Sequence, residues 1–437
     1  MSIIKGFEMT TSQALDLGEK QPLDLASIAM AALEAGRMLL STGAKCTVVR
    51  SGMIMVATGL GADRADVRVG FASISVTVGD GPRTVTRMLG VGHHGVNMKL
   101  SHRLRSICAR AARGEMTCEE VHAELAAAEK ASVRYPAIVV ALASGIACAA
   151  FGRLLGVDWP AFMPILVAGT LGQWVRMRMV HMHVNGFVIA GTVAFLSSLL
   201  AAFMSIYAGS GLIQVAMTAA VLMMVPGIPA MNSQMDIIEG YPTLGSARAL
   251  SVGMILIFLT IGVGLARLCL TGPDMSMEPL RNGIVHQMVF GAIAAAGFGV
   301  LFNFNHGNLV LSGVVGAIAL GVRTLGMEEG WNLATASFVA ALAVALVVEM
   351  VGFLPTNKYC QAGKALALAG CIPMIPGSAA AHWLIGLFGL MSHTPVDAVP
   401  VLTAAIQSGL LVIFTIGGIG SALAIVSSLA RRPEFPE

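Results

Sequence analysis

Two proline–glycine pairs interrupt hydrophobic stretches of this chain, at Pro226-Gly227 and, 150 positions later (376 − 226), at Pro376-Gly377. Proline removes a backbone hydrogen-bond donor and glycine tolerates an unwound backbone, so each pair predicts a break in a helix. In hydrocarbon, the freed backbone groups are costly unless protein, water or a ligand satisfies them. The two breaks therefore predict a polar binding site inside an apolar helical bundle.

Polar side chains near these breaks are the candidate ligands. A half-helix that starts after a break presents free N–H groups to an anion such as a carboxylate. Asp236 suits an ammonium group or a proton, although a solvated acid in a loop explains its position equally well. His382 is a candidate proton carrier, but a histidine at the interfacial end of a helix is the simpler interpretation. The predicted substrate-binding residues are Pro226, Gly227, Asn232, Asp236, Pro376, Gly377, Ser378 and His382.

Glu349 is an acid with apolar neighbours on both sides, in the stretch AVALVVEMVGF (343–353). An acid inside a membrane span is energetically expensive, and it is by default a functional candidate. We therefore predict that Glu349 or Asp236 carries a coupled proton. The alternative for Glu349 is that its side chain reaches the interface at the nearby end of the span.

The overall composition places the chain in a membrane. Of its 437 residues, 56% are hydrophobic and only 12% are charged, whereas a soluble domain carries roughly twice that charged fraction. Most of the chain is therefore expected to face lipid or other apolar helices. The formal net charge of +3 is too weak to favour a nucleic-acid partner.

Neither a metal nor another cofactor is predicted. The seven cysteines form no CxxC pair, and His93-His94, His181 and His183 have no cysteine or carboxylate partners at ligand spacing. No GxxxxGK[ST] loop is present for a nucleotide, so transport driven by ATP on this chain is not expected.

Residues 1–136 are predicted to form a soluble α+β domain. The pattern predicts helices over 24–43, 96–113 and 117–131, with a capping box from Thr117 to Glu120, and a hairpin from the alternating stretches 67–78 and 84–89.

From residue 137 onward, apolar stretches of ~20 residues match the thickness of a bilayer core. About ten spans are expected, grouped as a first membrane repeat over 137–272 and a second over 273–437. The expected spans are 137–155, 160–176, 186–207, 211–229, 246–270, 286–304, 307–323, 332–354, 361–380 and 399–429.

The two membrane halves show an internal repeat. A shift of 147 positions (290 − 143) lays ASGIACAAFGRL (143–154) on FGAIAAAGFGVL (290–301), and it lays Val175-Arg176 on Val322-Arg323. Each half has an odd number of predicted spans, so the second must insert upside down relative to the first. Inverted repeats with paired discontinuous helices are a transporter architecture. The fold class predicted is therefore a polytopic α-helical membrane protein with two inverted five-helix repeats and an N-terminal α+β domain.

The distribution of Lys and Arg in short loops predicts the orientation. Basic residues before the first span, after the second and eighth, and after the last fall on one side of the membrane. This pattern favours a cytoplasmic N-terminus and a cytoplasmic C-terminus, with the chain in the inner (cytoplasmic) membrane.

Several motifs resemble the threonine/serine exporter family across nearly the whole chain. They are EAGRMLLSTGA (34–44), GVNMKLSHRLRS (95–106), VPGIPAMNSQMDIIEGYPTLGSAR (225–248) and IPMIPGSAA (372–380). The resemblance implies a ten-helix layout and export of threonine and serine driven by the proton gradient. The matching positions are Pro226, Gly227, Asp236, Gly240, Gly245, Arg248, Pro376 and Gly377.

One departure concerns Lys45 and the residues after it, where the family often has an acid. This departure leaves the role of the N-terminal domain open. We predict a proton-coupled exporter of small hydroxylated amino acids, in contact with lipid and as a possible homo-oligomer. A membrane-anchored hydrolase-like enzyme that uses the N-terminal domain, and a transporter or channel for another small polar metabolite, are the alternatives.

Overall fold

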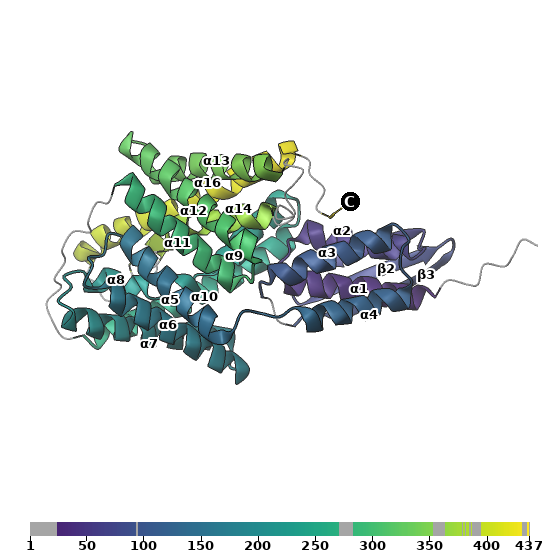
Figure 1. Cartoon of the computed structure of the whole chain (residues 1–437), viewed down its shortest axis with the longest axis horizontal. Helices are drawn as coiled ribbons and strands as arrows, with labels where there is room; N and C mark the ends of the chain where they lie inside the picture. Colours follow the sequence, from purple (N-terminus) through teal and green to yellow (C-terminus); the bar gives the residue numbers. More distant parts are fainter. Residues whose placement is uncertain are drawn as a thin grey trace, which may run out of the picture.

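The structure is a computed structural model (Figure 1). It describes residues 24–92, 95–270, 283–352, 363–377, 379–380, 382–383, 386, 395–430 and 435–436. His93, His94 and Ser378, which the sequence singled out, lie outside these described residues.

Residues 24–131, called here the N-terminal unit, combine four helices with a three-stranded sheet (Figure 1). The strands form an antiparallel meander in the order β1-β2-β3. The elements are α1 Leu25–Ser41, α2 Cys46–Gly59, β1 Arg64–Val69, β2 Ser73–Asp80, β3 Arg83–Gly90, α3 Met98–Ala112 and α4 Cys118–Ala131.

The predicted helices of this unit are confirmed, but the predicted first strand is wrong in one respect. The stretch 67–78 is not continuous, because the chain turns at 70–72 with the Gly70 amide donating to the Ser73 carbonyl. Two strands result, and β2 alternates between buried and half-buried residues as a strand over a core does. The Thr117 capping box is present in α4, whereas α2 was not anticipated from the sequence.

The described residues within 137–430, called here the helical unit, contain helices and turns but no strand (Figure 1). Short 3-10 turns, η1 and η3, lie inside its two broken segments. The elements are α5 Ala137–Leu154, α6 Phe162–His181, α7 Gly186–Tyr207, α8 Ile213–Ala219, η1 Leu222–Met224, α9 Gly227–Ile238, α10 Pro242–Leu268, α11 Ile284–Leu301, α12 His306–Glu328, α13 Leu333–Gly352, α14 Gly363–Cys371, η3 Ile372–Met374 and α16 Pro395–Ala430.

Seven of the described helices are long and apolar enough to cross a membrane, and the count is up to eight if a bent pair forms one span. The bent pair joins 213–224 to 227–238 at an angle of 60°. The sequence predicted about ten spans. Helix α6 is not among the seven, and its second half carries Gln173, Arg176 and Arg178. The chain is thus a multi-pass membrane protein.

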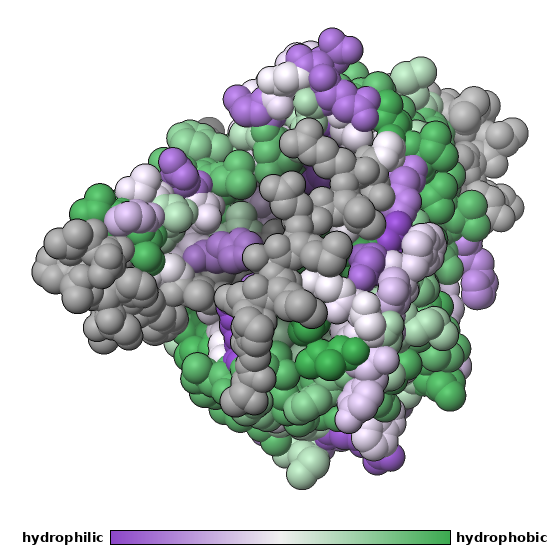
Figure 2. All heavy atoms as spheres, turned by 90° about the vertical axis from the view of Figure 1, so that its left-hand side faces the viewer, coloured by the Kyte–Doolittle hydropathy of each residue, from purple (hydrophilic) through white to green (hydrophobic). Residues whose placement is uncertain are grey.

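Large apolar side chains remain exposed on the outside of the helical unit. On α5 they recur at helical spacing, at Ile138, Leu142 and Ile146. Figure 2 looks at the end of the unit that lies away from the N-terminal unit, and hydrophobic residues cover much of the outer surface there. Hydrophilic residues gather at the top and in a band right of centre. An apolar surface of this extent fits contact with lipid acyl chains.

The elements of the helical unit recur in the same order. A short helix, a 3-10 turn and a break follow α7 in the first half and α13 in the second. The breaks match bond for bond: Gly227 N donates to Val225 O and Gly377 N to Ile375 O, each at 2.8 Å. Val225 and Ile375 have nearly the same backbone angles, φ −61°, ψ 123° and φ −64°, ψ 124°. A residue before proline is forced into this extended region, so both predicted helix breaks are confirmed.

The equivalent helices α5 and α11 run in opposite directions. Leu154 at the end of α5 accepts a hydrogen bond from Gln287 in the first turn of α11, at 3.3 Å. At the other end, Tyr135 just before α5 donates to the carbonyl of Phe304 just after α11, at 2.8 Å. Two helices joined in this way at opposite ends are antiparallel.

The two breaks contact each other reciprocally. A Cβ atom built on Gly227 would lie 3.0 Å from Ile372, the first residue of η3. A Cβ atom built on Gly377 would lie 2.8 Å from Leu222, the first residue of η1. Each glycine therefore packs against the 3-10 turn of the other broken segment.

The C-terminal end returns to the N-terminal unit. Phe435 is buried in the core of that unit, beside Gly52 of α2. Figure 1 shows the C-terminus next to α2. Both ends of the membrane region therefore lie on the same side of the helical unit.

The reciprocal packing predicts a specific rescue. Gly227→Val should destabilise the purified protein by about 1–3 kcal/mol, because the added side chain overlaps Ile372 in a packed core. Ile372→Ala in the same chain should recover part of the lost melting temperature. Gly253→Val in α10 is the matched control, since open space surrounds that position. Equal melting curves for Gly227→Val and Gly253→Val would contradict the packing described.

Candidate functional site

The turn after α9 brings two charged residues of one motif together. Gly240 has φ +89°, and the Tyr241 amide donates back to the Asp236 carbonyl at 2.7 Å, which ends α9 in a left-handed cap. Helix α10 then begins at Pro242 and runs in the direction opposite to α9. As a result Arg248 Nη1 lies 2.5 Å from Asp236 Oδ2, in an ion pair that is buried on both sides.

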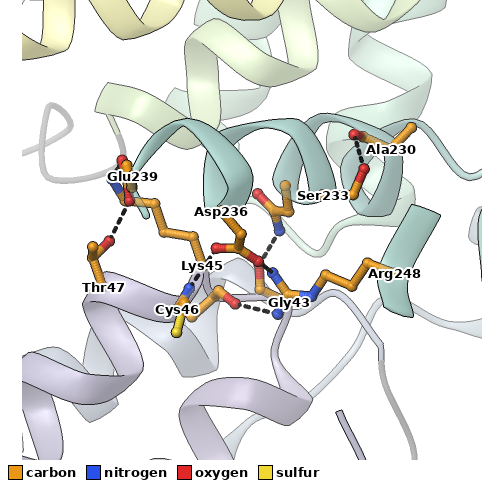
Figure 3. A network of polar contacts seen from close by, with 11 residues as sticks. Gly43, Lys45, Cys46, Thr47, Ala230, Ser233, Asp236, Glu239 and Arg248 are labelled. Atoms are coloured by element: carbon orange, nitrogen blue, oxygen red, sulfur yellow. Dashed lines mark hydrogen bonds and ion pairs between the residues drawn. The ribbon is translucent and has the colours of Figure 1, made fainter. Parts of the chain in front are cut away.

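Asp236 also caps a helix of the N-terminal unit (Figure 3). Gly43, just after α1, holds a left-handed backbone (φ +86°), and α2 begins three residues later without a side-chain cap of its own. Asp236 Oδ1 accepts the Cys46 N–H of that first turn at 2.8 Å. A carboxylate at a helix N-terminus satisfies an open donor and interacts favourably with the helix dipole.

Other contacts surround this pair and join the same two segments (Figure 3). Arg248 donates to the Ala44 carbonyl and Asn232 to the Gly43 carbonyl, each at 2.8 Å. Lys45 pairs with Glu239 at 2.5 Å, and the Thr47 hydroxyl donates to the same carboxylate at 2.7 Å. We call these contacts, between residues 43–47 and the residues Asn232, Asp236, Glu239 and Arg248, the α9 interface.

The α9 interface is held by buried charge rather than by surface ion pairs. Asp236 is fully buried and Arg248 is 5% exposed. Removing one partner of a buried pair leaves an uncompensated charge and costs about 3–5 kcal/mol. The N-terminal unit is therefore fixed directly to the half-helix that follows the first break.

A second contact fixes α3 of the N-terminal unit to the helical unit. The Met98 amide at the start of α3 donates to the Phe302 carbonyl at 3.0 Å, and Asn303 donates to Asn97 at 3.0 Å. Asn303 holds a left-handed backbone, φ +58°, in the turn between α11 and α12. This turn and the α9 interface together set the position of the N-terminal unit.

A cavity with about 80 Å³ of space lies between the two units. This volume has room for several water molecules or for a small solute. Helices α9, α13, α14 and α16 form one side, where Asn232 and Glu349 are the main polar residues. The N-terminal unit forms the other side, with Lys45, Ser101 and Arg105 among its lining residues. Ile228, next to the first break, also lines the cavity.

The structure brings some of the predicted residues together and separates others. Asn232 and Glu349 line one cavity, and the two proline–glycine breaks face each other next to it. Asp236 lies in the α9 interface, where it is buried, so the alternative of a solvated loop acid is wrong. His382 is exposed and is not among the residues that line the cavity.

Sequence reasoning did not single out three residues of the interface and the cavity. Lys45 and Cys46 bind the first membrane half, and Arg105 lines the cavity. A signal existed for the pair of Asp236 and Arg248, since an acid and a base in one apolar motif are expected to pair. No local pattern distinguishes Arg105 from the other arginines of α3.

The broken helices and the apolar outer surface of the helical unit are typical of a multi-pass membrane transporter. Residues 30–268 match the family model described as "Putative threonine/serine exporter", and residues 287–429 match "Threonine/Serine exporter, ThrE". The first match alone covers more than half of the chain. The chain therefore belongs to the threonine/serine exporter family, and the enzyme alternative is set aside.

Two curated relatives are similar to about half of the chain. Both are named "Probable succinate transporter subunit YjjP". The Escherichia coli (strain K12) protein is 25% identical over 238 residues, which cover 54% of this chain and 91% of the relative. The Klebsiella aerogenes protein is 23% identical over 235 residues, which cover 54% and 90%. No solved structure matches the chain.

The α9 interface predicts the reactivity of Cys46. Burial, and then the Asp236 carboxylate, raise the pKa of the Cys46 thiol to about 12, so very little reactive thiolate exists at pH 7.5. Asp236→Ala removes the nearby negative charge and loosens the interface, which lowers this pKa. We expect alkylation of Cys46 by N-ethylmaleimide to become at least about tenfold faster, since one pKa unit changes the thiolate fraction tenfold.

Mass spectrometry of the cysteine-containing peptides measures this rate in the intact protein. Asp66→Ala, at an exposed position of β1, is the matched control, and the exposed Cys269 is the internal reference. An unchanged Cys46 rate in Asp236→Ala would show that Asp236 does not hold the two units together.

Proposed function

We propose that this protein is a secondary transporter that exports small hydroxylated amino acids, threonine and serine, in exchange for protons. The observation that carries the proposal is the pair of matching helix breaks that pack reciprocally in the buried core of the helical unit. Discontinuous helices paired in this way are the substrate-binding element of several transporter folds. The family descriptions supply the substrate class.

The architecture proposed is two inverted five-helix repeats behind an N-terminal cytoplasmic domain, with boundaries at residues 1–136, 137–272 and 273–437. The opposite directions of α5 and α11 support inversion of the second half. The return of Phe435 to the N-terminal unit supports an even number of spans, with both termini on the cytoplasmic side of the inner membrane. Because the relatives are named as subunits, assembly with further copies belongs to the proposal.

Substrate and proton are proposed to bind at the breaks and in the adjoining cavity. The breaks contribute Pro226, Gly227, Pro376 and Gly377, with Ser378 next to the second break. Asn232 is placed to contact a bound solute because it lines the cavity with Glu349. Glu349 is our proton carrier, with Asp236 as the second candidate, and His382 is the remaining proposed contact. A carboxylate that holds either a proton or a substrate ammonium group couples their opposite movements.

A dicarboxylate is the second candidate substrate. The observation in its favour is the name of the two relatives, which are described as succinate transporter subunits. Two cationic side chains, Lys45 and Arg105, line the cavity and suit such an anion. A dicarboxylate and an amino acid share one carboxylate and differ in the group at the other end.

Counterflow in proteoliposomes separates these substrates. Vesicles preloaded with unlabelled threonine, serine or succinate are diluted into the same labelled solute, with and without an inward proton gradient. We expect labelled threonine and serine to accumulate transiently and succinate not to. Accumulation of succinate alone would overturn the amino-acid assignment and indicate a dicarboxylate transporter instead.

Glu349→Gln should separate coupling from binding. Glutamine keeps the shape of the side chain but cannot release a proton, so efflux driven by the gradient should fall to the background level. Exchange of labelled for unlabelled substrate should continue at saturating substrate, because it needs no net proton movement, although loss of the negative charge weakens binding of the ammonium group. Glu329→Gln, at an exposed position just after α12, is the matched control. Gradient-driven efflux at the unaltered rate in Glu349→Gln would remove Glu349 from the mechanism.

A further inference from the structure

The cavity between the two units has an unequal distribution of charge. The wall from the helical unit carries one acid, Glu349, and one amide, Asn232. The wall from the N-terminal unit carries two cations, Lys45 and Arg105, and the hydroxyl of Ser101. The other lining residues are mainly apolar. A solute with a negative and a positive end matches this arrangement when each end faces the wall of opposite charge.

Helix α3 presents one continuous face to the cavity. Met98, Ser101 and Arg105 all line it, at positions i, i+3 and i+7 of the helix. The position of this face is fixed at its start, because the Met98 amide is bonded to the Phe302 carbonyl of the helical unit. Arg105 therefore lies on a helix that is bonded to the helical unit at its first turn, not on an exposed loop.

Of the two cations, Arg105 is the better partner for a carboxylate. Lys45 lies 2.5 Å from Glu239 and helps to hold the two units together at the α9 interface. The guanidinium group of an arginine is planar and always charged, and it matches the two oxygens of a carboxylate. Ser101, one turn before Arg105, adds a hydroxyl on the same wall.

We propose that Arg105 binds the carboxylate of the transported solute while Glu349 faces its ammonium group. The N-terminal unit is then one wall of the substrate site. This inference rests on the proposed function for the identity of the solute. The carboxylate is common to an amino acid and to a dicarboxylate, so the assignment of Arg105 is tested separately from the choice between them.

The test compares ligands that differ only in the carboxylate. Purified full-length protein is melted in the presence of increasing L-serine, L-serinamide or succinate, and the affinity is obtained from the rise in melting temperature. Serinamide keeps the hydroxyl and ammonium groups of serine and replaces the carboxylate by a neutral amide. The wild-type protein should bind serine at least about tenfold more tightly than serinamide, since a hydrogen-bonded charge is lost with the amide.

Arg105→Gln should lower the affinity for serine about 10- to 100-fold and leave that for serinamide unchanged. Arg103→Gln is the matched control, because Arg103 is exposed on the same helix. It should behave as the wild type. The melting temperature without ligand reports folding in the same experiment. If Arg105→Gln does not fold, Arg105→Lys is used instead. It should lose part of the preference for serine over serinamide, since lysine keeps the positive charge but lacks the planar guanidinium group.

Each other outcome has a defined meaning. A variant at Arg105 that keeps the wild-type preference for serine over serinamide would overturn the assignment. If the wild type binds succinate and not serine, the amino-acid proposal fails. The assignment of Arg105 then stands only if Arg105→Gln lowers the affinity for succinate about 10- to 100-fold. If neither carboxylate ligand stabilises the wild type, the carboxylate site itself is rejected.

Discussion

The fully buried carboxylate of Asp236 is the constraint on which the arrangement of the two units depends. A buried charge must find donors, and Asp236 finds them in Arg248 of its own motif and in the first turn of α2. The same requirement brings the carbonyl groups of Gly43 and Ala44 against Asn232 and Arg248. The N-terminal unit is thus joined to α9, the half-helix that begins at the first break. A movement of α9 during transport would therefore displace the N-terminal unit directly.

The two helix breaks and the cavity have related physical origins. Each break follows from a proline that removes a donor and forces an extended residue before it. The glycine after the proline permits close contact with the other half of the protein, at Ile372 and at Leu222. Helix α9, which leaves the first break, then supplies Asn232 to the cavity wall. The segment that is broken inside the helical unit therefore also lines the cavity between the two units.

The location of the cavity gives the N-terminal unit a role that its own sequence does not suggest. Lys45 of this unit forms an ion pair with Glu239 at the α9 interface. Its α3 presents Ser101 and Arg105 to a space whose opposite wall carries Glu349. We propose that this unit forms one wall of the substrate site, a role that uses no catalytic residues of its own. The membrane transporter class of the family agrees with this arrangement.

The sequence alone determined the membrane class, both helix breaks, most helix boundaries and the resemblance to the family, because each depends on local composition and spacing. It placed α7 at 186–207, as observed, and it identified Asn232 and Glu349, which the fold brings to one cavity. Only the tertiary structure decided the partners of Asp236, since Cys46 lies 190 positions away in the chain. It also decided that Arg105 and Glu349 line the same cavity. Hydropathy and periodicity describe neighbours along one element, whereas these contacts join elements from separate units, and only the folded packing sets them.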